Sequence, residues 1–246
     1  MNIKEKEFYS NIKNWDFSKI NYTIETISNF DFYKTISNYS NSSSLCLDLG
    51  TGGGENLLKN YPEVGYIIAT DISEEMLKTA KNNLKNYPNK KVKFILSDNL
   101  NLNFPNEMFD LISARHTQIN YQLSYNILVK GGVLVIEGVD TKDCFELKEI
   151  FNRGQEFNSK EILSKFEYEN LLKVGFQKVE LFNYLFNEYY ASKNDLLNLL
   201  MKTPIINEFE TNKEIEDDLL EKYINKFTSD KGIKLKREYY GILAIK

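Results

Sequence analysis

The sequence predicts an α/β protein with a mostly parallel sheet of seven strands, helices on both faces and an antiparallel hairpin at one edge. Two observations lead to this prediction. Between residues 45 and 151, short apolar runs alternate with amphipathic stretches of helix length, a pattern typical of βαβ units with buried parallel strands. In addition, three of the apolar runs carry an aspartate at their carboxyl ends, namely Asp48, Asp71 and Asp98. Ligands bind at that edge of a parallel sheet.

Each expected element follows from its own pattern. Continuous apolar runs of about five residues predict buried strands, here over residues 45–49, 66–70, 92–96, 109–114 and 133–139. Apolar side chains that recur every three or four residues predict helices, here over residues 55–61, 73–86, 119–129 and 144–151. Asp71 or Ser73 is the expected N-cap of the second helix.

The carboxyl-terminal part continues the same fold. Helices are expected over residues 159–174, 195–201 and 214–228, and strands over residues 177–184 and 238–245. These last two strands are expected to form the antiparallel hairpin, which closes the sheet edge.

Two domains are expected, with a boundary in the Ser- and Asn-rich stretch from Asn38 to Ser44. Residues 1–41 are predicted to form an N-terminal helical lid, with helix over about residues 3–37, and residues 42–246 the main domain. The aromatic side chains of this lid either cover a ligand or belong to the core. They are Trp15, Phe30, Phe32 and Tyr33.

Composition narrows the protein class. A chain of 246 residues with 42% hydrophobic and 27% charged residues is typical of a globular protein. It contains no apolar run long enough for a transmembrane helix, and its first residues do not resemble a signal peptide. With Cys46, Cys144 and one histidine, no zinc site is expected. A reducing cytoplasm is the expected location. The net charge of -4 makes nucleic acid an unlikely partner.

A glycine-rich loop follows the first predicted parallel strand, with the sequence Asp48-Leu-Gly-Thr-Gly-Gly-Gly54. It is not the dinucleotide fingerprint, because Glu55 stands where the third glycine belongs, and it lacks the Lys-Ser/Thr of a P-loop. A carboxylate at this place repels pyrophosphate but can face a cationic amino acid. The structural alternative is a plain tight turn between strand and helix.

Two further acids have candidate roles at the same edge. The carboxylate of Asp71 can accept hydrogen bonds from both hydroxyls of a ribose, or it can form a capping box with Glu74. Asp98, with Asn99 beside it, can bind the exocyclic amine of adenine or simply act as a turn residue.

Taken together, these motifs resemble those of class I S-adenosylmethionine-dependent methyltransferases of the small-molecule type. The resemblance extends over Leu45–Val139. It rests on four stretches of sequence: Leu47-Asp-Leu-Gly-Thr-Gly52, Asp71 with the helix Ser73–Ala80, Phe109-Asp-Leu-Ile112, and Leu128-Val-Lys-Gly-Gly132, which lacks the usual proline. The flanking sequences resemble an uncharacterised bacterial branch of this superfamily.

The resemblance implies a Rossmann-like fold, S-adenosylmethionine as cofactor and a set of binding residues. Asp48 and the backbone of Gly50, Thr51 and Gly52 would hold the methionine end. Asp71 would hold the ribose, and Ile72 and Met76 would pack on adenine. Asp98 would bind the adenine amine beside the backbone of Asn99, and the carbonyl group near Ala114 would receive the methionine ammonium.

The reaction implied is an SN2 methyl transfer to an oxygen, nitrogen or carbon atom. His116 is the candidate general base for a hydroxyl acceptor; alternatively it lines the site or is purely structural. Arg115 either binds an acidic substrate or pairs with a nearby acid, which we favour. A small-molecule acceptor is favoured because the Pro-Pro motif of base-amine methyltransferases is absent. The alternatives are a methyltransferase for RNA or protein and a non-catalytic cofactor-binding protein.

Overall fold

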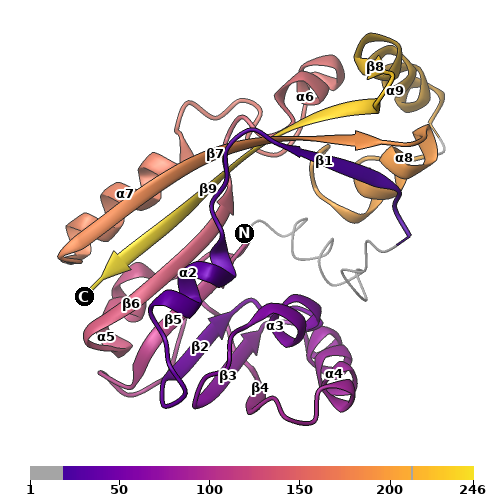
Figure 1. Ribbon diagram of the computed structural model, residues 1–246. Coiled ribbons are helices and arrows are strands. Elements are labelled where there is room, and N and C mark those ends of the chain that lie inside the picture. Colours follow the sequence, from indigo (N-terminus) through magenta and orange to yellow (C-terminus); the bar gives the residue numbers. More distant parts are fainter. Residues whose placement is uncertain (1–18, 212) are drawn as a thin grey trace.

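The computed structural model describes residues 19–211 and 213–246 of the chain, which build one twisted sheet covered by helices (Figure 1). The strand order is β1-β7-β9-β6-β5-β2-β3-β4, and β8 pairs with β9 outside this path. The strands are β1 (Tyr22–Thr26), β2 (Leu45–Leu49), β3 (Tyr66–Asp71), β4 (Val92–Leu96), β5 (Phe109–Arg115), β6 (Leu128–Val139), β7 (Lys178–Tyr190), β8 (Thr228–Ser229) and β9 (Gly232–Ile245).

The five strands from β6 to β4 are parallel, whereas β1, β7 and β9 are antiparallel to their neighbours. The helices are α2 (Phe32–Asn38), α3 (Glu55–Asn60), α4 (Glu74–Asn83), the 3-10 turn η1 (Leu84–Asn86), α5 (Tyr121–Ile127), α6 (Phe145–Phe151), α7 (Leu163–Val174), α8 (Lys193–Lys202) and α9 (Glu214–Phe227). The expected mostly parallel α/β fold with its antiparallel hairpin is thereby confirmed.

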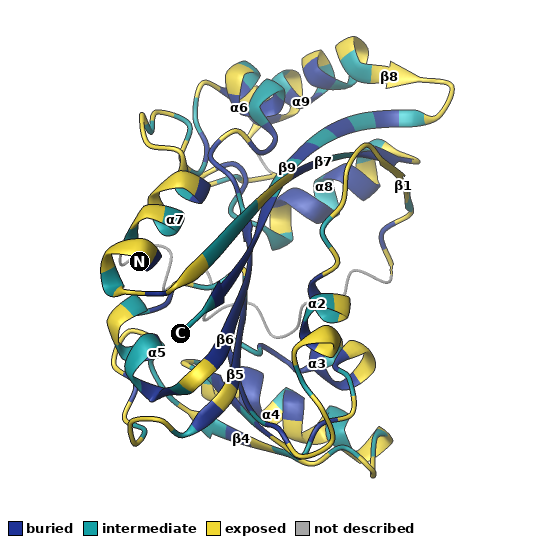
Figure 2. Ribbon diagram, turned by 60° about the vertical axis from the view of Figure 1, so that its left-hand side comes forward, coloured by how far each residue is buried: buried dark blue, intermediate teal, exposed yellow. Residues whose placement is uncertain are grey.

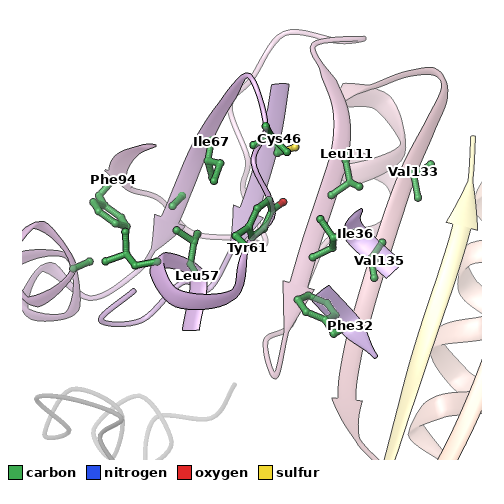
Figure 3. Close-up of a cluster of buried hydrophobic side chains, with 14 of the residues drawn as sticks. Phe32, Ile36, Cys46, Leu57, Tyr61, Ile67, Phe94, Leu111, Val133 and Val135 are labelled. Atoms are coloured by element: carbon green, nitrogen blue, oxygen red, sulfur yellow. The ribbon is translucent and has the colours of Figure 1, made fainter. Parts of the chain in front are cut away.

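Three apolar clusters form the core. The first packs α2, α3 and α4 on one face of the sheet (Figure 3), and the second packs α5 and α7 on the other. The third lies between the far ends of β7 and β9 and helices α6, α8 and α9. Strands β5 and β6 are buried along most of their length in the centre of the molecule (Figure 2).

Side chains in a strand point to alternate faces of the sheet, and this fixes where the first aspartate lies. Cys46 belongs to the cluster on the α2–α3 face, whereas Leu47 and Leu49 belong to the cluster on the opposite face. The side chain of Asp48 therefore lies on the α2–α3 face.

The N-terminal segment differs from the prediction. The helix expected over about residues 3–37 is not continuous, because residues 22–26 form strand β1, which pairs with β7. Its sequence, Tyr-Thr-Ile-Glu-Thr, is rich in the β-branched and aromatic residues that fit a sheet, and the ring of Tyr22 stacks on Tyr190. Trp15 lies outside the described residues.

The strand count is the second difference. The sheet has nine strands rather than seven, the additions being β1 and the two-residue β8. The sheet edge is therefore formed by β1 and not by the hairpin of β7 and β9. Within the described residues, none of the helices is long and apolar enough to cross a membrane.

Candidate active site

The glycine-rich loop connects β2 to α3 through left-handed backbone conformations. Gly50, Gly52 and Gly54 have φ angles of 70°, 58° and 75°, which glycine adopts without a steric penalty. The loop also lies very close to the segment after β5, because a Cβ added at Gly50 would be 2.7 Å from the Cβ of Thr117. The backbone N–H of Thr51 donates to the carbonyl oxygen of Thr70 at the end of β3. Three strand ends thus meet at this loop.

Asp71 faces the glycine-rich loop from the end of β3. One carboxylate oxygen accepts a hydrogen bond from the backbone N–H of Gly52 and the other from that of Ser73, both at 2.9 Å. The N-cap of α4 is Ser73, whose hydroxyl accepts from the backbone N–H of Met76. The structure therefore excludes the capping box proposed for Asp71. Burial raises the pKa of Asp71, and the backbone hydrogen bonds partly oppose this.

Asp48 is a buried carboxylate beneath the loop. The Ser113 hydroxyl lies 2.7 Å from Asp48 Oδ1, and the Tyr61 hydroxyl lies 3.1 Å from Ser113 Oγ. Burial raises the pKa of Asp48 to about 6. A buried acid of this kind favours a nearby positive charge, which would lower its pKa again.

Asp98 and Asn99 shape the turn after β4. The Asp98 carboxylate accepts from the backbone N–H of Leu100 at 2.9 Å and from the Asn101 side chain at 2.8 Å, so the turn-residue role is realised. The Asn99 amide binds the hydroxyl groups of Thr70 and Thr117 at 3.1 and 3.0 Å. Asn99 therefore ties β3 to the segment after β5.

Two apolar side chains are exposed beside this turn. Ile72 is 54% exposed and Leu100 is 40% exposed, whereas Met76 is only 3% exposed because it lies on the buried face of α4. This corrects the pairing expected from sequence: Ile72 is free to pack on a flat ring at this edge, and Met76 is not. Leu100 was missed, although an apolar residue directly after the Asp-Asn turn is a usable signal.

A charged group lies where β5 and β6 end, one residue after the buried Ala114. Arg115 Nε is 2.6 Å from Glu137 Oε1, and His116 Nε2 is 3.5 Å from the same oxygen. The Tyr184 hydroxyl donates to Glu137 Oε2 at 3.0 Å. Pairing of Arg115 with a nearby acid is thus confirmed. Glu137 was missed from sequence, although an acid in an otherwise apolar strand is a signal.

The electrostatics of this group follow from its burial and its partners. Burial alone would raise the pKa of Glu137, but His116 and Arg115 lower it to about 2. Burial and the charge of Arg115 lower the pKa of His116. Its backbone has a φ angle of 53°, and its N–H donates to the Glu137 carbonyl oxygen. A neutral imidazole is therefore held beside an ion pair.

Arg115 and Glu137 form one side of a groove on the α2–α3 face. Phe30 and Tyr33 border it from the N-terminal segment, and Asn56 borders it from α3. Phe32 also borders the groove but belongs to the core, where it is buried. The expected lid aromatics thus divide between the groove and the core.

Residues 46–129 match a protein-family model described as a methyltransferase domain. The matched stretch contains the glycine-rich loop, Asp71 and Asp98, so this part of the chain is similar to a methyltransferase domain.

The chain is also similar to a named methyltransferase over part of its length. Demethylmenaquinone methyltransferase of Bacteroides fragilis is 31% identical over 115 residues, which cover 43% of this chain and 47% of that protein. The match thus spans about half the length of the curated relative.

Solved structures share the fold. YcgJ from Bacillus subtilis has a TM-score of 0.60 at 14% identity, over 87% of this chain and 96% of that one. A phosphoethanolamine N-methyltransferase from Haemonchus contortus, in complex with phosphomonomethylethanolamine and S-adenosylhomocysteine, has a TM-score of 0.53 at 18% identity, over 87% of this chain and 52% of that one.

Proposed function

We propose that the protein transfers a methyl group from S-adenosylmethionine to a small molecule. The observation that carries this proposal is the meeting of the Asp71 carboxylate and the glycine-rich loop, 2.9 Å apart, within a methyltransferase domain. The solved relative with S-adenosylhomocysteine supports the cofactor.

The residues present fit this cofactor. The glycine-rich loop and the Asp71 carboxylate lie together at the carboxyl ends of the strands, and two exposed apolar side chains, Ile72 and Leu100, lie beside the turn after β4. The proposed binding residues are Asp48, Gly50, Thr51, Gly52 and Ala114 for the methionine end, Asp71 for the ribose, and Ile72, Asp98 and Asn99 for the adenine.

When bound, S-adenosylmethionine supplies a methyl group on a sulfonium, which is already an activated leaving group. The protein's main task is then alignment and exclusion of water. Asp48 supplies a buried negative charge opposite the cationic amino acid. His116, held by Glu137, is proposed as the base that removes a proton from a hydroxyl acceptor.

Other features support a small acceptor inside a reducing cytoplasm. The chain carries a net charge of -4, which is unfavourable for a nucleic-acid partner. Both cysteines are free and buried. We also propose that residues 1–41 cover the cleft of a catalytic domain formed by residues 42–246, because Phe30 and Tyr33 border the groove.

Calorimetric titration with S-adenosylmethionine tests the proposed function. The parent protein should bind, and Asp71→Ala should bind at least tenfold more weakly, a loss of about 1.4 kcal/mol or more. Asp110→Ala is the matched control, because this aspartate also accepts a backbone N–H, from Leu45 at 2.7 Å, but at the opposite edge of the sheet. The affinity of Asp110→Ala for S-adenosylmethionine should stay within twofold of the parent value.

The possible outcomes distinguish a direct role of Asp71 in cofactor binding from a role in stabilising the fold. Folded parent protein that does not bind S-adenosylmethionine would refute the proposal. Equal losses in Asp71→Ala and Asp110→Ala would show that Asp71 acts only by stabilising the backbone.

A further inference from the structure

Three aromatic rings lie together on the hairpin of β7 and β9, beside the candidate active site. Tyr184 and Phe186 are two residues apart on β7, and Tyr239 lies opposite Tyr184 on β9, so all three point to one face. Their centroids are 5.8 Å apart for Tyr184 and Tyr239 and 5.0 Å apart for Phe186 and Tyr239. We call these three residues the aromatic wall.

The aromatic wall is continuous with the active site on two sides. The His116 ring meets Tyr239 edge-on at 5.2 Å, and Tyr184 donates its hydroxyl hydrogen bond to Glu137. Phe30 borders the groove, and the centroid of its ring lies 6.4 Å from that of Tyr184. An acceptor seated on the wall would therefore lie between His116 and the groove.

Part of the aromatic wall reaches the surface of the protein. Phe186 and Tyr239 are half-buried, Tyr184 is buried, and the His116 side chain is 28% exposed. Half-buried aromatic rings can attract other aromatic rings by stacking and edge contacts, worth about 0.5–1.5 kcal/mol per pair, and Phe186 is the half-buried wall residue that, within the described part of the chain, has no overlying guanidinium. A flat acceptor gains these contacts, whereas a saturated ring of the same size does not.

The charges next to the wall are already paired. Arg115 is paired with Glu137, and Arg237, whose guanidinium lies over the Tyr239 ring, is paired with Asp143 and Glu188. A charged acceptor would have to compete with these ion pairs for its counter-ion. Uncharged acceptors avoid that cost.

We propose that the wall binds an uncharged, planar aromatic acceptor whose hydroxyl group faces His116 and is methylated on oxygen. This inference rests on the proposed function. Because His116 Nε2 is directed at Glu137, Nδ1 is the nitrogen left to take the hydroxyl proton. The acceptor oxygen forms the new C–O bond, and the electron pair of the broken C–S bond stays on sulfur. The imidazolium that results lies beside the Glu137 carboxylate.

Three probes of similar skeleton test the acceptor class. They are β-naphthol, its saturated analogue decahydro-β-naphthol, and hydroxynaphthoate, which is charged. Calorimetry on protein saturated with S-adenosylhomocysteine should show that β-naphthol binds at least tenfold more tightly than the other two. Incubation of β-naphthol with S-adenosylmethionine should yield its methyl ether, detected by mass spectrometry.

Matched variants test the wall itself. Phe186→Leu keeps an apolar side chain but removes the ring, and should weaken β-naphthol binding at least fivefold while the affinity for S-adenosylmethionine stays within twofold. Phe166→Leu is the control, because this phenylalanine is exposed on α7, and both of its affinities should stay within twofold of the parent.

The outcomes distinguish this inference from the proposed function. A folded parent protein that does not bind S-adenosylmethionine would refute both the proposed function and this inference. Binding of S-adenosylmethionine without preference for β-naphthol, or equal effects of the two variants, would overturn only the acceptor class. Tight binding of β-naphthol without ether formation would overturn the transfer to oxygen.

Discussion

At the scale of single residues, Glu137 is the shared partner of two neighbours. Its carboxylate contacts both Arg115 and His116. The ion pair leaves Arg115 without a free charge for an anionic ligand, and burial keeps His116 neutral near pH 7 because it lowers the histidine pKa. A neutral histidine is the form that can accept a proton.

This arrangement predicts the titration of His116, which is readily observed because the chain has one histidine. Its NMR resonance should titrate with a pKa below 6.5. Glu137→Gln should lower that pKa further, because it removes the carboxylate that favours the charged imidazolium and leaves the repulsion of Arg115. Glu180→Gln, which removes an acid paired with Lys178 at the surface, should not move it. A pKa that rises in Glu137→Gln would contradict the geometry described.

Glu167, on α7, is a half-buried acid whose Oε2 atom is buried. Burial raises its pKa to about 7, partly opposed by the hydroxyl groups of Tyr240 and Tyr121. Within the described residues, its Oε2 atom has no hydrogen-bond partner. The folded protein therefore favours the protonated form of this group.

The shift predicts a stability that depends on pH. Between about pH 4.5 and pH 7 the folded state holds a proton on Glu167 that the unfolded state releases, so this acid lowers the stability of the fold as pH rises. The unfolding free energy of Glu167→Gln minus that of the parent should therefore be about 3 kcal/mol larger at pH 8 than at pH 4.5. Urea unfolding at both pH values measures this gain. Glu169→Gln, at an exposed site of the same helix, should show no such trend.

At the scale of elements, the glycine-rich loop combines backbone conformation with close packing. Gly50 and Gly131 both have left-handed φ angles, but a Cβ at Gly50 would meet Thr117, whereas a Cβ at Gly131 has no atom within 4 Å. Comparing substitutions at these two glycines therefore distinguishes the effect of backbone strain from that of steric overlap.

Alanine substitution at both glycines makes this separation measurable. Gly131→Ala should lower the unfolding free energy by about 1–2 kcal/mol through strain alone and leave binding of S-adenosylmethionine unchanged. Gly50→Ala should lower the unfolding free energy by more than this, because Thr117 and the loop must move apart. The same movement should weaken the binding of S-adenosylmethionine at least tenfold. Equal stability losses in thermal unfolding, with binding intact in both variants, would show that the close approach has no role.

Among the elements, those with a strong local pattern were predicted correctly. The β2–α3 and β3–α4 units follow directly from an apolar run, a turn and an amphipathic stretch. Strand β1 was not predicted, because Tyr22–Thr26 is largely exposed and gains its hydrogen bonds from β7, which lies more than 150 residues away. Pairing partners at that separation leave little trace in the local sequence.

At the scale of the whole molecule, the N-terminal segment is part of the core. Ile36 of α2 is fully buried and lies beside Val135 of β6 in the first apolar cluster (Figure 3). Strand β1 continues the sheet beyond β7. The segment thus contributes to stability as well as bordering the groove.

Two isoleucines of this segment test that contribution. Ile36→Ala should lower the unfolding free energy by about 2–5 kcal/mol, as for other buried residues, and should lower the melting temperature accordingly. Ile24→Ala, at a position that is 57% exposed, should change it by less than about 0.5 kcal/mol. A small loss for Ile36→Ala in thermal unfolding would mean that the segment is only loosely attached.

The sequence by itself determined the parallel core of this protein and the edge where its candidate ligand site lies. Strand length, alternation and glycine conformation are local properties, and Asp48, Asp71 and the glycine-rich loop are fixed by them. The tertiary structure alone decided which side chains meet there. Glu137, Tyr184 and Tyr239 come from three strands, and they reach His116 because β6, β9 and β7 pair in that order. Such contacts depend on the register between distant strands, which a local pattern does not contain.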